Sequence, residues 1–159
     1  MANSSWYCGG IFYKIEDRKC FILVVPYIDK HRNNQRQIRL PGGSSNGDID
    51  IEDTLIREMM EETGLVPCEY NLIYENIKSP EHTQYFFLIK EYSGEMLCFE
   101  GLNPIDPETE QPEWVDAYEL EKTIFHTHKI AFKMAINQIA CESSKDFEIL
   151  QNLLLLIEK

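Results

Sequence analysis

The chain has 159 residues, of which 43% are hydrophobic and 26% charged, an ordinary globular composition that excludes a disordered chain. A chain of this length buries one core, so we expect residues 1–159 to form a single domain. The formal net charge of −12 disfavours non-specific binding to nucleic acid, which needs a basic surface, and it means that a phosphate substrate would need cations between itself and the protein.

The five cysteines are widely spaced, with no C-x-x-C pair and no zinc-ligand spacing, so we expect buried thiols in a reducing compartment. The first residues, MANSSWYCGG, lack the basic start and the apolar core of a signal peptide. No apolar run approaches the roughly 18 residues that a membrane span needs. These features predict a cytoplasmic protein without a membrane partner, and they leave its oligomeric state open.

The first half of the chain predicts strands followed by a helix. Residues 6–13 and 20–27 are rich in aromatic and β-branched side chains and flank the polar KIEDRK, which predicts a hairpin. Residues 37–43, QIRLPGG, predict a short strand that ends at a proline and two glycines. Residues 50–62 have helical periodicity, and Gly64 stands where a helix C-cap belongs. The expected apolar stripe of this helix is Leu55, Ile56, Met59 and Met60.

The second half predicts strands and then helices. Two strands are expected over residues 71–77 and 83–92, and the second alternates poorly, which indicates burial on both faces. Residues 100–113 form a proline-rich acidic loop, and residues 114–125 a short strand that turns into a helix. Residues 127–141 and 143–158 are expected to be helical. This order predicts an α/β sandwich with a mixed sheet and flanking helices.

The predicted helix over residues 50–62 carries three glutamates, Glu58, Glu61 and Glu62, within one narrow sector. Like charges at this spacing repel, and in the second half of a helix they also oppose its dipole. One interpretation is a solvated face on which an Arg57–Glu61 pair softens the repulsion. The other is a metal site, because clustered carboxylates supply the hard oxygen ligands that Mg²⁺ or Mn²⁺ selects, and the ion then bridges the protein to substrate phosphates.

The surroundings of these glutamates resemble the Nudix box, G-x5-E-x7-R-E-U-x-E-E-x-G-U, in which U is a bulky apolar residue. The residues that match the pattern in register are Gly43, Arg57, Glu58, Met59, Glu61, Glu62, Gly64 and Leu65. Ile49 takes the place of the first glutamate, with Asp48 and Asp50 on either side. Either the loop slips locally so that Asp48 does the work of the glutamate, or that work is missing.

The resemblance implies the Nudix fold, an α/β/α sandwich with a mixed sheet, here with extra C-terminal helices. It also implies metal-dependent hydrolysis of the diphosphate linkage in a nucleoside diphosphate joined to a group X, with Mg²⁺ or Mn²⁺ as cofactor and a small nucleotide as partner. By this resemblance the catalytic residues are Arg57, Glu61 and Glu62, the substrate-binding residues are Arg39, Gly42 and Gly43, and the metal ligands are Gly43, Glu58, Glu61, Glu62 and Glu110. Glu61 is a further metal ligand or the general base.

The group X is not specified by these motifs. A nucleoside triphosphate, a dinucleoside polyphosphate and a nucleotide sugar all satisfy the implied chemistry. The alternative to an enzyme is a catalytically silent Nudix-like nucleotide-binding module, which loss of a glutamate from R-E-x-x-E-E would favour, and none is lost. An isomerase of similar fold would need a cysteine beside a base, and no cysteine here has a recognisable base partner.

Members of the family often recruit one more acidic residue from the loop before the tryptophan strand. Glu108, Glu110 and Glu113 precede Trp114 here, and spacing favours Glu110, although a solvated acidic loop explains these residues equally well.

Several histidines and aromatic residues are weaker candidates. His126 and His128 are two apart and do not face each other on a helix, so we expect a surface or helix-capping role and no metal pair. His82 could approach a phosphate, although a lone histidine at a strand start more often packs or meets solvent. The aromatic residues that could either stack on a nucleobase or belong to the core are Trp6, Tyr7 and Tyr85.

Overall fold

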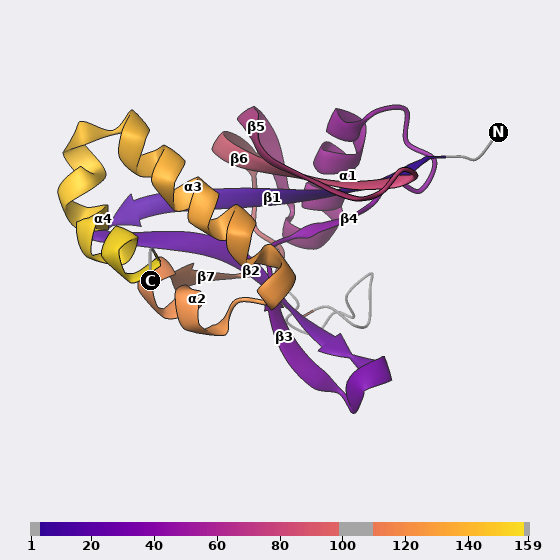
Figure 1. Ribbon diagram of the computed structural model, residues 1–159, viewed down its shortest axis with the longest axis horizontal. Helices are drawn as coiled ribbons and strands as arrows, with labels where there is room; N and C mark the ends of the chain where they lie inside the picture. Colours follow the sequence, from indigo (N-terminus) through magenta and orange to yellow (C-terminus); the bar gives the residue numbers. More distant parts are fainter. Residues whose placement is uncertain (1–3, 99–109, 158–159) are drawn as a thin grey trace.

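The computed structural model describes residues 4–98 and 110–157, and Figure 1 shows their arrangement. The strands are β1 (Ser5–Glu16), β2 (Lys19–Asp29), β3 (Gln35–Arg39), β4 (Gly42–Ser44), β5 (Leu65–Ser79), β6 (His82–Gly94) and β7 (Glu113–Asp116). The helices are α1 (Ile51–Thr63), α2 (Ala117–Thr123), α3 (Lys129–Glu142) and α4 (Ser144–Ile157), with the 3-10 turns η1 (Lys30–Arg32) and η2 (His126–His128).

The strands form one mixed sheet in the order β3-β2-β1-β6-β5, with β4 paired to β1 and β7 paired to β2. β1 and β6 run parallel, whereas β1 and β2, β2 and β3, and β5 and β6 pair antiparallel. The expected α/β sandwich with a mixed sheet is therefore confirmed. No helix in the described parts of the chain is long and apolar enough to cross a membrane.

Each face of the sheet has its own buried core. Side chains alternate along a strand, so Ile11 of β1 packs with α2, α3 and α4, whereas the adjacent Phe12 packs with α1. Phe86 and Phe87 of β6 divide in the same way, and both are buried. The prediction that the strand within residues 83–92 is buried on both faces is confirmed.

Helix α1 begins and ends with the expected signals. The carboxylate of Asp50 accepts a hydrogen bond from the backbone N–H of Asp53 at 2.8 Å, which caps the N-terminus. Gly64 adopts φ 80° and donates its N–H to the carbonyl of Met60, a left-handed cap that favours glycine. These local contacts fix the length of the helix that carries the acidic residues.

The apolar stripe expected on this helix is partly wrong. Leu55 and Met59 are fully buried against the sheet, but Ile56 is only half-buried and Met60 is 50% exposed. Residues one position apart on a helix point about 100° apart, so a helix that packs through Leu55 and Met59 turns their neighbours toward its edge. The buried face continues at Thr63, and it is narrower than the sequence pattern indicated.

The expectation of buried thiols is confirmed for two cysteines and wrong for three. Cys8 and Cys20 lie in the core, whereas Cys68, Cys98 and Cys141 are exposed. Cys68 is on the edge strand β5 and Cys141 is in the last turn of α3, two places where side chains face solvent. All five are free thiols, so no disulfide contributes to the fold.

Candidate active site

Gly42 and Gly43, which we call the glycine turn, are the first two residues of β4, and this strand pairs with β1 and contacts helix α1. A Cβ added at Gly43 would lie 2.3 Å from the carboxyl carbon of Glu58. A Cβ at Gly42 would lie 2.5 Å from the carbonyl oxygen of Cys8 and from the hydroxyl of Tyr7. Gly42 therefore lies too close to the backbone of β1 for a side chain, whereas a side chain at position 43 would displace the flexible carboxyl end of Glu58.

Arg57 connects the acidic face of α1 to the loop before it. Its Nη2 donates to the carboxylate of Asp48 and to the carbonyl of Ser44, both at 2.8 Å. Its Nη1 donates to Glu58 at 2.8 Å and to Glu61 at 3.2 Å. The planar fork of one guanidinium therefore holds the loop and two of the glutamates in a fixed relation.

Asp48, which precedes the pattern position of the first glutamate, is the loop residue that binds Arg57. Ile49 is 88% exposed and points away, whereas Asp48 accepts from Arg57 and from the hydroxyl of Thr54 at 2.8 Å. The hydrogen bond from Arg57 holds the pKa of Asp48 below its ordinary value. Of the two alternatives left open by the sequence, this contact favours the one in which Asp48 does the work of the glutamate, and that role stays a prediction.

Two of the α1 glutamates, Glu58 and Glu62, converge on Gly42 and Gly43. The backbone N–H of Gly42 donates to Glu62 Oε1 at 2.6 Å, and the carboxyl group of Glu58 packs over Gly43. Burial raises the pKa of Glu58, an effect that neighbouring Arg57 partly offsets. A half-buried carboxylate beside other carboxylates is stabilised in its ionised form by added positive charge.

The chemistry of these oxygen atoms fits a hard divalent cation. The Glu58 carboxylate lies where a Cβ on residue 43 would be, directly against the backbone of the glycine turn. Carboxylate and carbonyl oxygens are the ligands that Mg²⁺ and Mn²⁺ prefer. Within residues 4–98 and 110–157, no three His, Cys, Asp or Glu side chains already form a metal cluster. Here Arg57 binds Glu58 and Glu61, and the Gly42 N–H binds Glu62.

Arg39 lies beside this turn in a fixed orientation. Its guanidinium is stacked between Tyr27, with 4.1 Å to the ring centroid, and Phe125, with 4.6 Å. Its Nε donates to Gln37 Oε1 at 2.8 Å, and Nη2 bonds to the same oxygen. A pocket of about 110 Å³ next to it is lined by Tyr7, Val25, Tyr27, Arg39, Leu40, Gly42 and Glu62. The structure thus brings together Arg39, Gly42 and Glu62, three of the residues that the resemblance selected.

Two of the loop acids pair with a cation of β3. Glu110 donates its backbone N–H to Pro26 at 2.8 Å, and its carboxylate forms an ion pair with Arg36 at 3.1 Å. Glu113 also pairs with Arg36, at 3.7 Å, whereas Glu108 lies outside the described residues. In this arrangement the carboxylate of Glu110 neutralises a cation of β3. Its role as a metal ligand stays a prediction.

The two histidines of η2 differ from each other. His126 is exposed, as expected, but the expectation of a surface or capping role for His128 is wrong, because it is 4% exposed and its side chain makes no cap bond. The prediction treated this segment as α-helix and expected His128 at the surface. The segment is instead a 3-10 turn in front of α3, and its third residue, His128, faces the core.

The remaining candidates have contacts away from the turn, with one exception. Trp6 donates its indole N–H to Thr54 at 2.8 Å, and Tyr85 packs against the core beneath α1. The imidazole Nδ1 of His82 lies 3.1 Å from the hydroxyl of Ser5 at the start of β1. The exception is Tyr7, which lines the small pocket.

Sequence reasoning missed three residues here, namely Tyr27, which lines the pocket, and Gln37 and Phe125, which contact Arg39. They come from separate segments of the chain, and no local pattern connects them.

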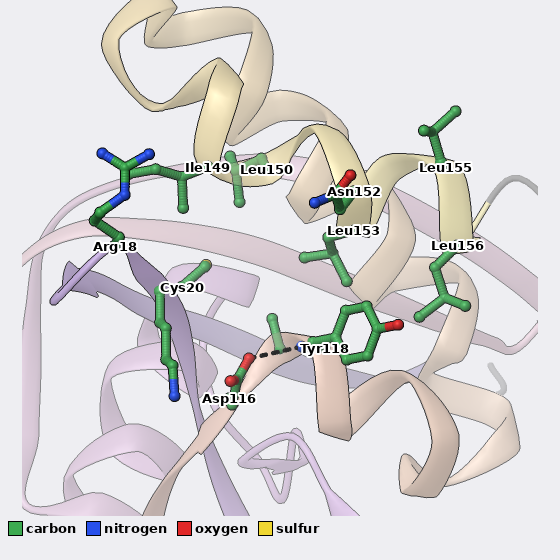
Figure 2. Close-up of a pocket in the computed structure, with 12 residues that line it drawn as sticks. Arg18, Cys20, Asp116, Tyr118, Ile149, Leu150, Asn152, Leu153, Leu155 and Leu156 are labelled. Carbon is green, nitrogen blue, oxygen red and sulfur yellow. Dashed lines mark hydrogen bonds between the residues drawn. The ribbon is translucent and has the colours of Figure 1, made fainter.

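A larger pocket, of about 520 Å³, lies elsewhere (Figure 2). It is bordered by Arg18 at the β1–β2 turn, by Tyr118 at the start of α2 and by leucines of α4. None of the residues selected from the Nudix pattern lines it. Although this pocket is larger than the one beside Arg39, the metal chemistry that the glutamates of α1 imply does not belong to it.

Comparison with known proteins gives a family and a fold. A family model described as NUDIX domain matches residues 10–134. No curated protein matches the chain by sequence. Among solved structures, a MutT NUDIX hydrolase from Burkholderia pseudomallei aligns with a TM-score of 0.61 and 20% identity, covering 84% of this chain and 98% of the other.

Two other solved structures have similar scores. The NUDIX domain of Shewanella oneidensis NrtR, complexed with ADP ribose, has a TM-score of 0.65 and 14% identity over 87% of this chain and 90% of its own. An ADP compounds hydrolase has a TM-score of 0.66 and 11% identity over 87% of this chain and 75% of its own. At these identities the alignments establish the fold.

Proposed function

The chain belongs to the NUDIX domain family as a Nudix-type pyrophosphohydrolase, and on that premise we propose that it hydrolyses the diphosphate linkage of a nucleoside diphosphate joined to a group X, using Mg²⁺ or Mn²⁺. The observation that carries the proposal is the convergence of the Glu58 and Glu62 carboxylates on the Gly42–Gly43 backbone. A face that is merely solvated does not explain why two of its carboxylates lie against this backbone.

The ligands in this proposal are the carboxylates of Glu58, Glu61 and Glu62 and the carbonyl oxygen of Gly43, with Glu110 as a further candidate. When bound, the divalent cation neutralises the diphosphate and lowers the pKa of a bound water. Glu61, whose side chain is 46% exposed, is the member of this set with most freedom to accept a proton at its carboxylate.

The chain's own cations position the acidic residues and the substrate. Arg57 holds Glu58 and Glu61 in orientation through Nη1 while it anchors the Asp48 loop through Nη2. Arg39 presents a preorganised guanidinium at the pocket that Glu62 lines, where it can bind a phosphate group. Because Arg39 is already ordered by its ring contacts, little side-chain entropy is lost when the phosphate binds.

The first experiment is a screen of nucleotide derivatives with Mg²⁺ and Mn²⁺. The panel contains nucleoside triphosphates, dinucleoside polyphosphates, ADP-ribose and nucleotide sugars, and the measurement is release of phosphate, pyrophosphate or mononucleotide. We expect at least one of them to be hydrolysed in a reaction that EDTA abolishes. The kinetics of the best substrate then define the group X.

The decisive variant is Glu62→Gln, which keeps the size of the side chain and removes its charge. We expect kcat to fall by about a hundredfold or more, because the loss of a metal ligand removes several kcal/mol of charge stabilisation in the transition state. The matched control is Glu119→Gln, which changes an exposed glutamate on α2 that pairs with Lys122. A folded Glu62→Gln protein with full activity would contradict the proposal, and tight nucleotide binding without turnover by wild type would favour the silent binding module.

A further inference from the structure

His128 is a buried histidine that the proposed reaction does not use. Its Nδ1 accepts a hydrogen bond from the backbone N–H of Leu40 at 3.1 Å, and its Nε2 lies 3.5 Å from the hydroxyl of Tyr7. The ring also packs edge-on against Phe86 and Phe125, with centroid distances of 5.4 Å and 5.6 Å. A neutral imidazole has one donor and one acceptor nitrogen, so acceptance at Nδ1 places the proton on Nε2, facing Tyr7.

The chain just before His128 docks onto strand β3. The backbone N–H of Phe125 donates to the carbonyl of Ile38 at 2.8 Å, and Ile124 forms a parallel bridge with Ile38. These backbone bonds bring the segment that begins the C-terminal helices next to β3, close to the glycine turn, although the two segments are far apart in the sequence. The imidazole, three residues after Phe125, is thereby placed at the end of β3.

The turn beyond Leu40 is held at successive points. His128 holds the Leu40 N–H, the Gly10 N–H donates to the carbonyl of Pro41 at 3.0 Å, and the Gly42 N–H donates to Glu62. The Gly42 N–H, which is one of the groups that hold the Glu62 carboxylate, thus lies two residues beyond the Leu40 N–H that His128 holds.

We propose that His128 is a positioning residue for Glu62, acting through the hydrogen bond from Leu40 to its Nδ1 and through the rigid turn from Leu40 to Gly42. This inference rests on the proposed function, since it assigns Glu62 to the reaction. The alternative is that His128 only fills the core, in which case its replacement would alter stability and leave the turnover of folded protein unchanged. The two differ in what they predict for kcat, because small displacements of a reacting group cost rate steeply.

The test compares three substitutions with different acceptor positions. His128→Asn places Oδ1 close to the position of Nδ1 and keeps the acceptor for Leu40. His128→Gln moves the oxygen outward toward Tyr7, and His128→Leu removes all polar atoms. A core variant in α3, Ile139→Val, controls for lost stability, because Ile139 is buried and its apolar side chain cannot hydrogen-bond to the turn. Melting temperatures in EDTA are measured for every variant.

The assay uses the best substrate of the panel at saturating Mg²⁺. We expect kcat to fall about tenfold or more in His128→Leu and His128→Gln, with KM changed less than about twofold, and His128→Asn to recover most of the rate. Equal kcat for the Asn, Gln and wild-type proteins would overturn the inference, and this comparison stands even if His128→Leu does not fold. If the proposed function is wrong, Glu62→Gln will be fully active. If Glu62→Gln is inactive and His128→Gln is fully active, only the positioning role of His128 is refuted.

Discussion

At the scale of single residues, we predict that Asp48 does the work of the glutamate that Ile49 replaces. We expect Asp48→Asn to lower kcat about tenfold or more, since an uncharged amide holds Arg57 less firmly and the glutamates bound to Arg57 lose their orientation. Ile49→Glu restores the family pattern but changes a side chain that is 88% exposed, so kcat and the melting temperature should stay near wild type. Steady-state kinetics and thermal melts of the two variants decide the matter. A large gain of activity in Ile49→Glu would show that the loop has not slipped.

The buried imidazole of His128 gives a second prediction at this scale. Burial lowers its pKa from 6.5 to about 3, with smaller contributions from Arg39 and His126. The unfolded chain binds a proton near pH 6.5 that the folded chain does not, so this histidine's contribution to stability is complete above pH 6.5 and is lost progressively as the pH falls toward 3. Between pH 6.5 and 5 the loss is roughly 2 kcal/mol. Urea unfolding in EDTA at pH 7 and pH 5 should show a smaller difference for His128→Asn than for wild type, and an equal difference would contradict the assignment.

At the scale of elements, helix α1 carries one buried line and one acidic face. Met59→Ala removes a fully buried side chain between the helix and the sheet, and we expect it to lower the free energy of unfolding by about 2–5 kcal/mol. Met60→Ala changes a side chain that is 50% exposed, and alanine favours the helix, so its effect should stay below about 1 kcal/mol. Denaturant titration of this adjacent pair measures the orientation of the helix directly. Similar losses for the two variants would mean that α1 is rotated relative to the sheet.

At the scale of the whole molecule, a chain of net charge −12 places three glutamates on one side of helix α1, where like charges repel and a bound cation would lower the repulsion. Mg²⁺ at 100 times its dissociation constant should stabilise the folded state by about 2.7 kcal/mol and raise the melting temperature by several degrees relative to EDTA. The double variant Glu58→Gln with Glu62→Gln should lose this shift, and Glu119→Gln should keep it. The comparison is made at constant ionic strength, because general screening of surface charge would raise all of the melting temperatures alike. An equal shift in the double variant would place the cation elsewhere.

The sequence by itself determined features that depend on neighbouring residues. Asp50 and Gly64 mark the ends of α1, the spacing of Glu58, Glu61 and Glu62 puts their carboxylates on one side, and the apolar run of β6 indicates burial on both faces. Each of these follows from backbone geometry over a few residues, which is why pattern and structure agree.

Only the tertiary structure decided which contacts join distant segments. In the folded chain Arg57 binds Asp48, the neighbour of Ile49, and Met60 faces solvent. Cys68 is exposed on an edge strand, and His128 is buried behind the glycine turn. The physical reason is that burial and hydrogen bonding depend on what packs against a residue. For His128 the decisive partner is the Leu40 N–H, 88 residues away in the chain, and no local periodicity reports a contact of that range.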